Sequence, residues 1–135
     1  MNKLEVEITN IQISGGVILV DMTAYECKFS ALLIDTNERP SWLKTGGKIF
    51  AVFKEAEVSL AKELSGFLST RNRIPCQVLK IEQGELISLI TMNFHGETIR
   101  SAITSRALEH LDLHVGDEVL ALVKSNELTL MQKKS

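Results

Sequence analysis

The chain has 135 residues, 44% of them hydrophobic, and a formal net charge of −2. It has enough apolar material for an ordinary buried core. A nucleic-acid binder normally carries a basic balance or stripe, and a platform for single strands carries many aromatic rings, whereas this chain is slightly acidic with 5% aromatic residues. The sequence therefore argues against nucleic-acid binding.

The sequence also lacks membrane signals. The first five residues do not show the basic-then-apolar pattern of a signal peptide, and no apolar run reaches the roughly 18 residues that a membrane helix needs. Cys27 and Cys76 are the two cysteines, and such pairs in short cytosolic chains usually stay reduced. We expect a cytoplasmic protein with no membrane partner and no disulfide.

The first half of the chain has the alternating pattern of short β-strands. Leu4, Val6 and Ile8 alternate with polar residues, and the apolar phase then shifts, which predicts a bulge near residues 9–10. Further strands are expected at 17–22, 27–33, 49–53 and 58–61. Between the third and fourth of these strands, Pro40 is suited to the first turn of a short helix that ends at Gly46.

The second half repeats this order. Strands are expected at 74–81, 86–92, 98–103, 119–123 and 128–131, with a short helix at 105–111. A constant offset of 70 residues places Asn2 on Asn72, Met22 on Met92, Gly46 on Gly116 and Lys54 on Lys124. Such matches within corresponding hydrophobic runs favour a tandem repeat.

We therefore predict an all-β protein with two tandem five-stranded OB-like β-barrels, each with one short helix between strands 3 and 4. The predicted boundaries are 1–61 for the first unit, 62–68 for a linker and 69–135 for the second unit. The architecture by itself does not identify a ligand.

The sequence shows no signature of an enzyme. His95, His110 and His114 have no spacing that places two of them with a carboxylate, so we interpret them as solvated side chains. There is no phosphate-binding glycine loop, nucleophile elbow or cluster of metal ligands. We predict a binding protein that has no directly ligated metal.

Hydrogen-bond donors that could bind an anion are concentrated at two places in the sequence. Ser69, Thr70 and Arg71 lie at the seam between the copies, and Thr104 precedes Ser105, the expected N-cap of the second helix. Lys124 ends the fourth strand of the second copy. Together these groups suit a small tetrahedral dianion. The alternative interpretation is that Thr104 and Ser105 only cap a helix and that Lys124 is a turn lysine.

At these positions the chain resembles the molbindins, the molybdate-binding Mop or TOBE domains, in their tandem di-Mop arrangement. The family's Ser-Ala-Arg-Asn opening corresponds to Ser69-Thr70-Arg71-Asn72. The family's Ile-Thr-x-x-Ser segment corresponds to residues 103–107, and its Gly-Asp-Glu-Val stretch, leading into a strand that ends in Lys, corresponds to residues 116–124.

This resemblance implies a cytoplasmic protein that binds molybdate, or tungstate, for storage or homeostasis and needs no organic cofactor. It also implies a homo-oligomer, a trimer as the first expectation and a dimer as the second, with sites between units. Ser69 and Arg71 would then face Thr104, Lys124 and the amides of residues 105–107 of a neighbour, and Asn72 would be a secondary contact.

Two departures from the family pattern affect these expectations. Ala107 stands where the family usually has Ser, so one hydroxyl donor is missing. The first copy lacks the Ser-Ala-Arg part and has Leu33 or Ile34 in place of Thr104, which leaves Lys54 as a secondary candidate. We expect the first copy to be degenerate as a binding unit. The alternative function is a molybdate-sensing regulatory module that docks onto a transcription or transport partner.

Overall fold

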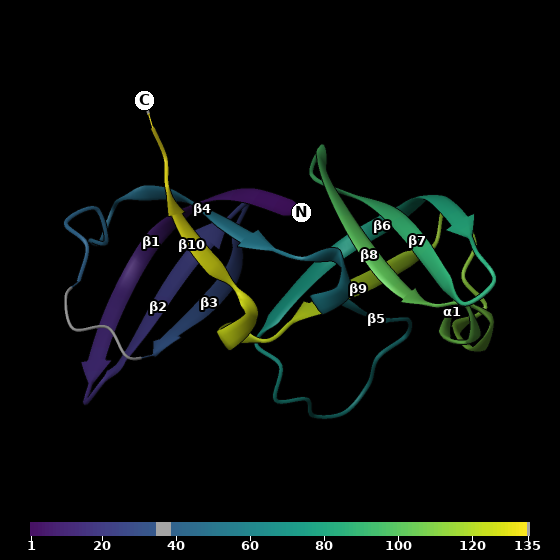
Figure 1. The fold of residues 1–135 in the computed structure, drawn as a ribbon, viewed down its shortest axis with the longest axis horizontal. Coiled ribbons are helices and arrows are strands. Elements are labelled where there is room, and N and C mark those ends of the chain that lie inside the picture. Colours follow the sequence, from purple (N-terminus) through teal and green to yellow (C-terminus); the bar gives the residue numbers. More distant parts are fainter. Residues whose placement is uncertain (35–38, 135) are drawn as a thin grey trace.

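A computed structural model describes residues 1–34 and 39–134, and Figure 1 shows two β-rich halves side by side. Almost all of the regular structure in these residues is β-strand. The elements are β1 (Asn2–Ser14), β2 (Val17–Ala24), β3 (Cys27–Ile34), β4 (Lys48–Phe53), the 3₁₀ turn η1 (Glu55–Glu57), β5 (Ser59–Ala61), β6 (Asn72–Gln83), β7 (Ile87–Phe94), β8 (Glu97–Thr104), α1 (Ser105–Leu111), β9 (Glu118–Val123), the 3₁₀ turn η2 (Ser125–Glu127) and β10 (Thr129–Gln132).

The strands form two five-stranded antiparallel sheets, with orders β10-β4-β1-β2-β3 and β5-β9-β6-β7-β8. The expectation of a mostly β protein is therefore confirmed. The expectation that each copy completes itself with its own last strand is wrong, because the short strands β5 and β10 are exchanged. Leu130 of β10 lies opposite Ala51 of β4, and Leu60 of β5 lies opposite Ala121 of β9. Each sheet therefore contains a strand from the other half of the chain (Figure 1).

Alternating burial explains why these segments are strands. In β1, Leu4, Val6 and Ile8 are buried and the residues between them are exposed. The register of β1 against β2 shifts between Ile8 and Asn10, as the phase change in the sequence predicts. The same shift occurs between Val78 and Lys80 of β6. The 70-residue repeat is thus reproduced down to the position of the bulge.

The helix predicted in the first copy is not present in the described part of that connection. Residues 39–47 form turns, in which Leu43 N–H donates to Pro40 O (3.0 Å) and Gly47 N–H donates to Lys44 O (3.0 Å). Gly46 and Gly47 disfavour a helix here, because glycine has a low helix propensity and Gly46 has a positive φ of 87°. Residues 35–38 of the predicted segment lie outside the described residues. The second predicted helix is confirmed as α1.

Two buried asparagines join the halves in a symmetric way. Asn72 accepts from Ser30 N–H (2.7 Å) and donates to Ser30 O (3.0 Å). Asn2 accepts from Arg100 N–H (2.7 Å) and donates to Arg100 O (2.8 Å). The offset of 70 residues relates Asn2 to Asn72 and Ser30 to Arg100, so the two bridges correspond. The first strand of each copy is therefore fixed to the third strand of the other copy.

A stacked aromatic pair lies at corresponding positions of the two hairpin turns. The rings of Tyr25 and His95 are 4.8 Å apart and nearly parallel, with an interplanar angle of 8°. The two residues are again 70 apart, and both have positive φ, of 50° and 51°. His95, expected as a solvated side chain, is exposed and also stacks on Tyr25 of the other copy.

We predict that Asn72→Ala lowers the free energy of unfolding by about 2–4 kcal/mol, because it leaves the buried N–H and C=O of Ser30 without a partner. Urea unfolding followed by circular dichroism measures this change. Asn126→Ala, at an exposed asparagine of η2, is the control and should change stability by less than about 0.5 kcal/mol. Equal effects of the two substitutions would contradict the bridging role of Asn72.

We also predict different reactivities for the two thiols, both of which are free. Burial, with a smaller contribution from nearby Cys27, raises the pKa of Cys76 to about 12, and burial also raises the pKa of the less buried Cys27. Because the thiolate is the nucleophile, iodoacetamide at mildly alkaline pH should label Cys27 first. Peptide mapping by mass spectrometry checks this order, with Cys27→Ser as the control. Faster labelling of Cys76 would refute it.

Candidate oxyanion site

Two of the cations expected at the site lie at the same end of one strand pair. Asn72 of β6 lies opposite Val123 of β9, so Arg71 and Lys124 flank this pair of residues at the seam between the halves. Both side chains are exposed. The structure thus places Arg71 and Lys124 at the same strand end of one chain.

Arg71 lines a cavity of about 680 Å³ that the two halves form together. The first half supplies most of the wall, including Thr9, Lys28 and Ser30, and the second half supplies Arg71 and Ser125. The hydroxyls of Ser30 and Ser125 are 2.6 Å apart. The polar groups in this wall are two cations, several hydroxyls and one carboxylate, that of Asp21. This composition suits an anion with several acceptor oxygens.

Arg73 holds the loop that carries the opening tetrapeptide. Its Nε donates to Thr70 O (3.1 Å), and its Nη2 donates to Leu68 O (2.6 Å). These bonds fix the backbone on both sides of Ser69. Arg73 belongs to none of the motifs in the sequence, so its role in holding this loop follows from the structure.

Thr104, and not Ser105, is the N-cap of α1. The Thr104 hydroxyl accepts from Ala107 N–H (3.1 Å), whereas Ser105 is buried, donates to Gly84 O (2.7 Å) and lies 2.7 Å from the Ser88 hydroxyl. The expected cap at Ser105 is therefore wrong, because tertiary packing draws its side chain into the sheet. The Ala107 amide, expected to face an anion, already has a partner in the cap.

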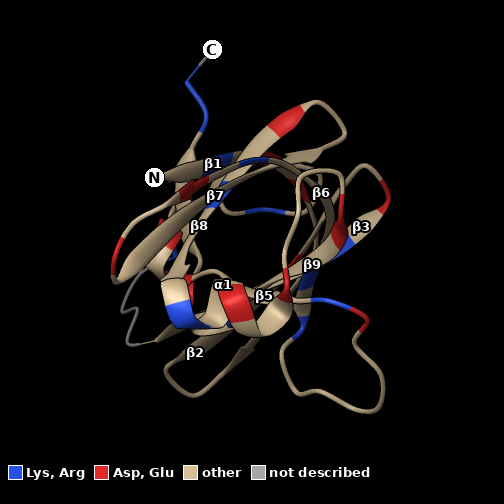
Figure 2. Ribbon diagram, turned by 90° about the vertical axis from the view of Figure 1, so that its right-hand side faces the viewer, with Lys and Arg blue, Asp and Glu red and all other residues tan. Residues whose placement is uncertain are grey.

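The helix end and the tetrapeptide do not line a common cavity within one chain. Thr104 and Ser105 line a different cavity, of about 440 Å³, together with the exposed apolar residues Leu86 and Ile87. Figure 2 shows α1 with both basic and acidic bands, so this end of the molecule has no uniform charge. Thr104 thus lines a different cavity from Arg71.

The strand register settles which residue replaces Thr104 in the first copy. Ile87 pairs with Thr104, and Val17 pairs with Ile34, so the counterpart of Thr104 is Ile34 rather than Leu33. The first copy therefore has no hydroxyl at this position. Lys54 keeps the place of Lys124, since Asn2 lies opposite Phe53 just as Asn72 lies opposite Val123.

Known proteins resemble this chain in sequence and in structure. The model of the TOBE domain matches residues 68–130. A crystal structure of the cytoplasmic molybdate-binding protein ModG with molybdate bound superimposes with a TM-score of 0.89 at 26% identity, over 98% of this chain and 96% of that chain. Residues 68–130 of this chain are a TOBE domain.

The sequence relatives of this chain are longer proteins. The molybdenum import ATP-binding protein ModC of Brucella abortus is 30% identical over 118 residues, which are 82% of this chain and 33% of ModC. The molybdenum-pterin-binding protein MopB of Rhodobacter capsulatus is 37% identical over 90 residues, which are 65% of this chain and 33% of MopB. The chain thus spans about a third of the length of the curated relatives that it matches.

The TOBE match also includes the exchanged strand. It ends at residue 130, within β10, although β10 lies in the sheet of the first half. In residues 1–34 and 39–134 there is no group of three or more side chains arranged as metal ligands. In the same residues, no helix is long and apolar enough to cross a membrane.

We predict that Thr104→Ala lowers stability by about 0.5–2 kcal/mol, because α1 loses its capping acceptor. Thr104→Ser keeps the hydroxyl and is the matched control, with stability close to that of the wild type. Thermal melting of the three proteins measures the difference. If the Ala variant is as stable as the Ser variant, the hydroxyl does not function as a cap.

Proposed function

We propose that this chain is a cytoplasmic, non-enzymatic protein that binds molybdate, or tungstate, for storage or homeostasis. The observation that carries the proposal is that Arg71 lines a cavity with Ser30 and Ser125, at the strand end where Lys124 also lies, in a chain that superimposes on molybdate-bound ModG along nearly its whole length. Under this proposal, each five-stranded sheet serves as the wall of an OB-like barrel that presents its strand ends to the ligand.

The donor set explains the choice of ligand class. Molybdate and tungstate are tetrahedral dianions, and each of their oxygens accepts hydrogen bonds from cations or hydroxyls, which are stronger when the donor is charged. Arg71 offers a fork of N–H donors, and Lys124 adds a compact positive charge. Ser69, Thr70 and the backbone next to Asn72 lie on the same loop as Arg71 and are held by Arg73.

We infer that neighbouring copies complete the site in a homo-oligomer, with a trimer as the first expectation and a dimer as the second. The supporting observation is that Thr104 and Ser105 lie in another cavity of the same chain, beside Leu86 (78% exposed) and Ile87 (58% exposed). A second copy seated on these apolar side chains would bring Thr104 and Ala107 toward a seam. Symmetric association of identical chains is the common way to bury such a surface.

A second candidate function is a molybdate-sensing module that docks onto a transport or transcription partner. The observation that favours it is the similarity to parts of longer proteins, ModC and the molybdenum transport protein ModE of Herbaspirillum seropedicae, which is 32% identical over 85 residues. The two functions differ in whether molybdate controls the binding of a partner protein. A partner recovered with the tagged protein only when molybdate is present supports sensing, and binding of several molybdate ions per oligomer without such a partner supports storage.

We predict that Arg71→Ala and Lys124→Ala each weaken molybdate binding by about 2–5 kcal/mol, because each removes a cation from a desolvated anion. Isothermal titration with molybdate, tungstate, sulfate and phosphate measures this loss, and native mass spectrometry counts the subunits. Lys54→Ala is the matched control at the corresponding position of the first copy, and its effect should be much smaller. Equal losses at Lys54 and Lys124 would contradict a site at the second seam.

A further inference from the structure

The two halves form two seams that are related by the repeat, and the seams differ in charge. The second seam contains Arg71, Lys124, Ser125 and Ser30. An offset of 70 residues places Met1, Lys54, Glu55 and Arg100 at the corresponding positions of the first seam. The first seam therefore has a carboxylate where the second has the Ser125 hydroxyl, and an arginine where the second has Ser30.

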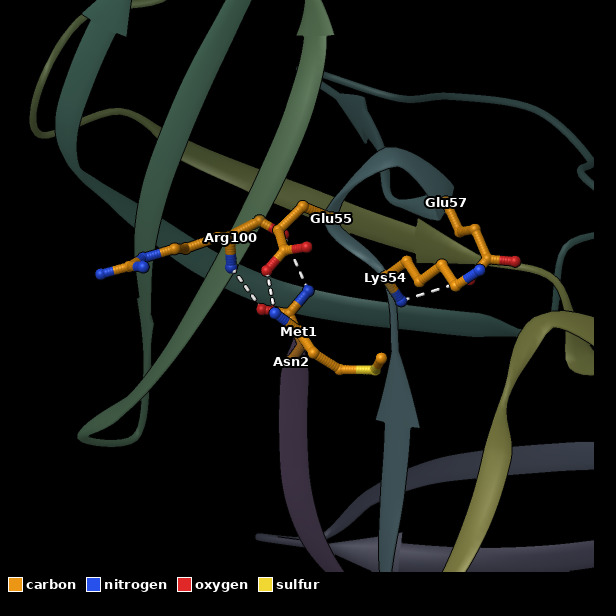
Figure 3. Close-up of polar contacts among 6 residues, drawn as sticks. All are labelled: Met1, Asn2, Lys54, Glu55, Glu57 and Arg100. Atoms are coloured by element: carbon orange, nitrogen blue, oxygen red, sulfur yellow. Dashed lines mark hydrogen bonds and ion pairs between the residues drawn. The ribbon is translucent and has the colours of Figure 1, made fainter.

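The contacts of Glu55 confirm this correspondence. Glu55 opens η1 directly after Lys54, as Ser125 opens η2 directly after Lys124. η1 packs against β8, and η2 packs against β3, which are the strands that carry Arg100 and Ser30. Figure 3 shows Glu55 near Arg100 and hydrogen-bonded to the amino group of Met1, beside the Asn2 bridge. Glu55 thus pairs with the Met1 amino group at the first seam.

The surroundings of Glu55 lower the pKa of its carboxyl. The hydrogen bond from the Met1 amino group makes the largest contribution, with a smaller one from the charge of Arg100, and together they lower the pKa of the Glu55 carboxyl. The side chain is 29% exposed. A carboxylate in this position offers its neighbours the same kind of charged oxygen that a tetrahedral anion would offer.

We propose that Glu55 is a built-in carboxylate that occupies the anion position of the first seam and confines oxyanion binding to the second seam. This inference rests on the proposed function of the second seam. The second seam has the Ser125 hydroxyl at this position, whereas an ionised Glu55 repels a dianion there and so disfavours its entry. The loss of function in the first copy is then caused by a specific negative charge as well as by the missing tetrapeptide.

Exchange of the two residues between the seams tests this proposal. Glu55→Ser gives the first seam the residue of the second, and we expect the number of molybdate ions bound per chain, measured by equilibrium dialysis and elemental analysis, to rise above that of the wild type. Ser125→Glu gives the second seam the residue of the first, and we expect it to lose molybdate binding. Circular dichroism verifies that both variants are folded.

Glu57→Gln is the control for a general change in charge. Glu57 accepts from Lys54 N–H (3.2 Å), and Glu127 stands at the same place in the second copy, so this acid does not distinguish the seams. The proposal is overturned if Ser125→Glu keeps wild-type affinity, if Glu55→Ser binds no additional molybdate, or if Glu57→Gln increases binding as much as Glu55→Ser. A wild-type protein that binds no molybdate would contradict the proposed function itself, whereas wild-type binding with unchanged variants would contradict this inference alone.

Discussion

The structure depends on the paired hydrogen bonds that Asn2 and Asn72 make with the backbone of the opposite half. Each asparagine is almost fully buried and satisfies both the N–H and the C=O of one residue in a strand that has no other ladder partner on that side. A buried polar group without a partner is costly, so these bridges fix how the halves meet. The exchanged strands β5 and β10 reinforce the same arrangement. The seams, and hence the candidate site, exist because the halves are held in this register.

The sequence predicts much of this fold because its signals are local. Alternating burial identifies the strands, the phase shift after Ile8 identifies the bulge, and the 70-residue offset identifies the repeat. It does not predict the strand exchange, because β5 and β10 are three and four residues long and their pattern suits either sheet equally well. The N-cap was also assigned wrongly from the sequence. Ser105 packs against β7 and the preceding turn, which leaves Thr104 as the cap.

The candidate site was predictable in its residues but not in its arrangement. Arg71 and Lys124 are recognisable from motifs, yet their position at one strand end follows from the pairing of Asn72 with Val123. The contributions of Ser30 and Lys28 come from the other half of the chain, and no spacing in the sequence reveals them. The repeat places comparable groups at both seams, and the difference in their charge follows from residues such as Glu55 that carry no motif. The two copies thus share a scaffold and differ in electrostatics.

The most direct test of this account is the position of the bound ion. Crystals grown with molybdate, measured near the molybdenum absorption edge, give an anomalous difference map that locates each ion without bias from the protein atoms. We predict a peak at the second seam, within hydrogen-bonding reach of Arg71 and Lys124, and no peak beside Lys54 and Glu55. Peaks of equal height at both seams, or a peak confined to the end of α1 without contact to Arg71 or Lys124 of any copy, would contradict it.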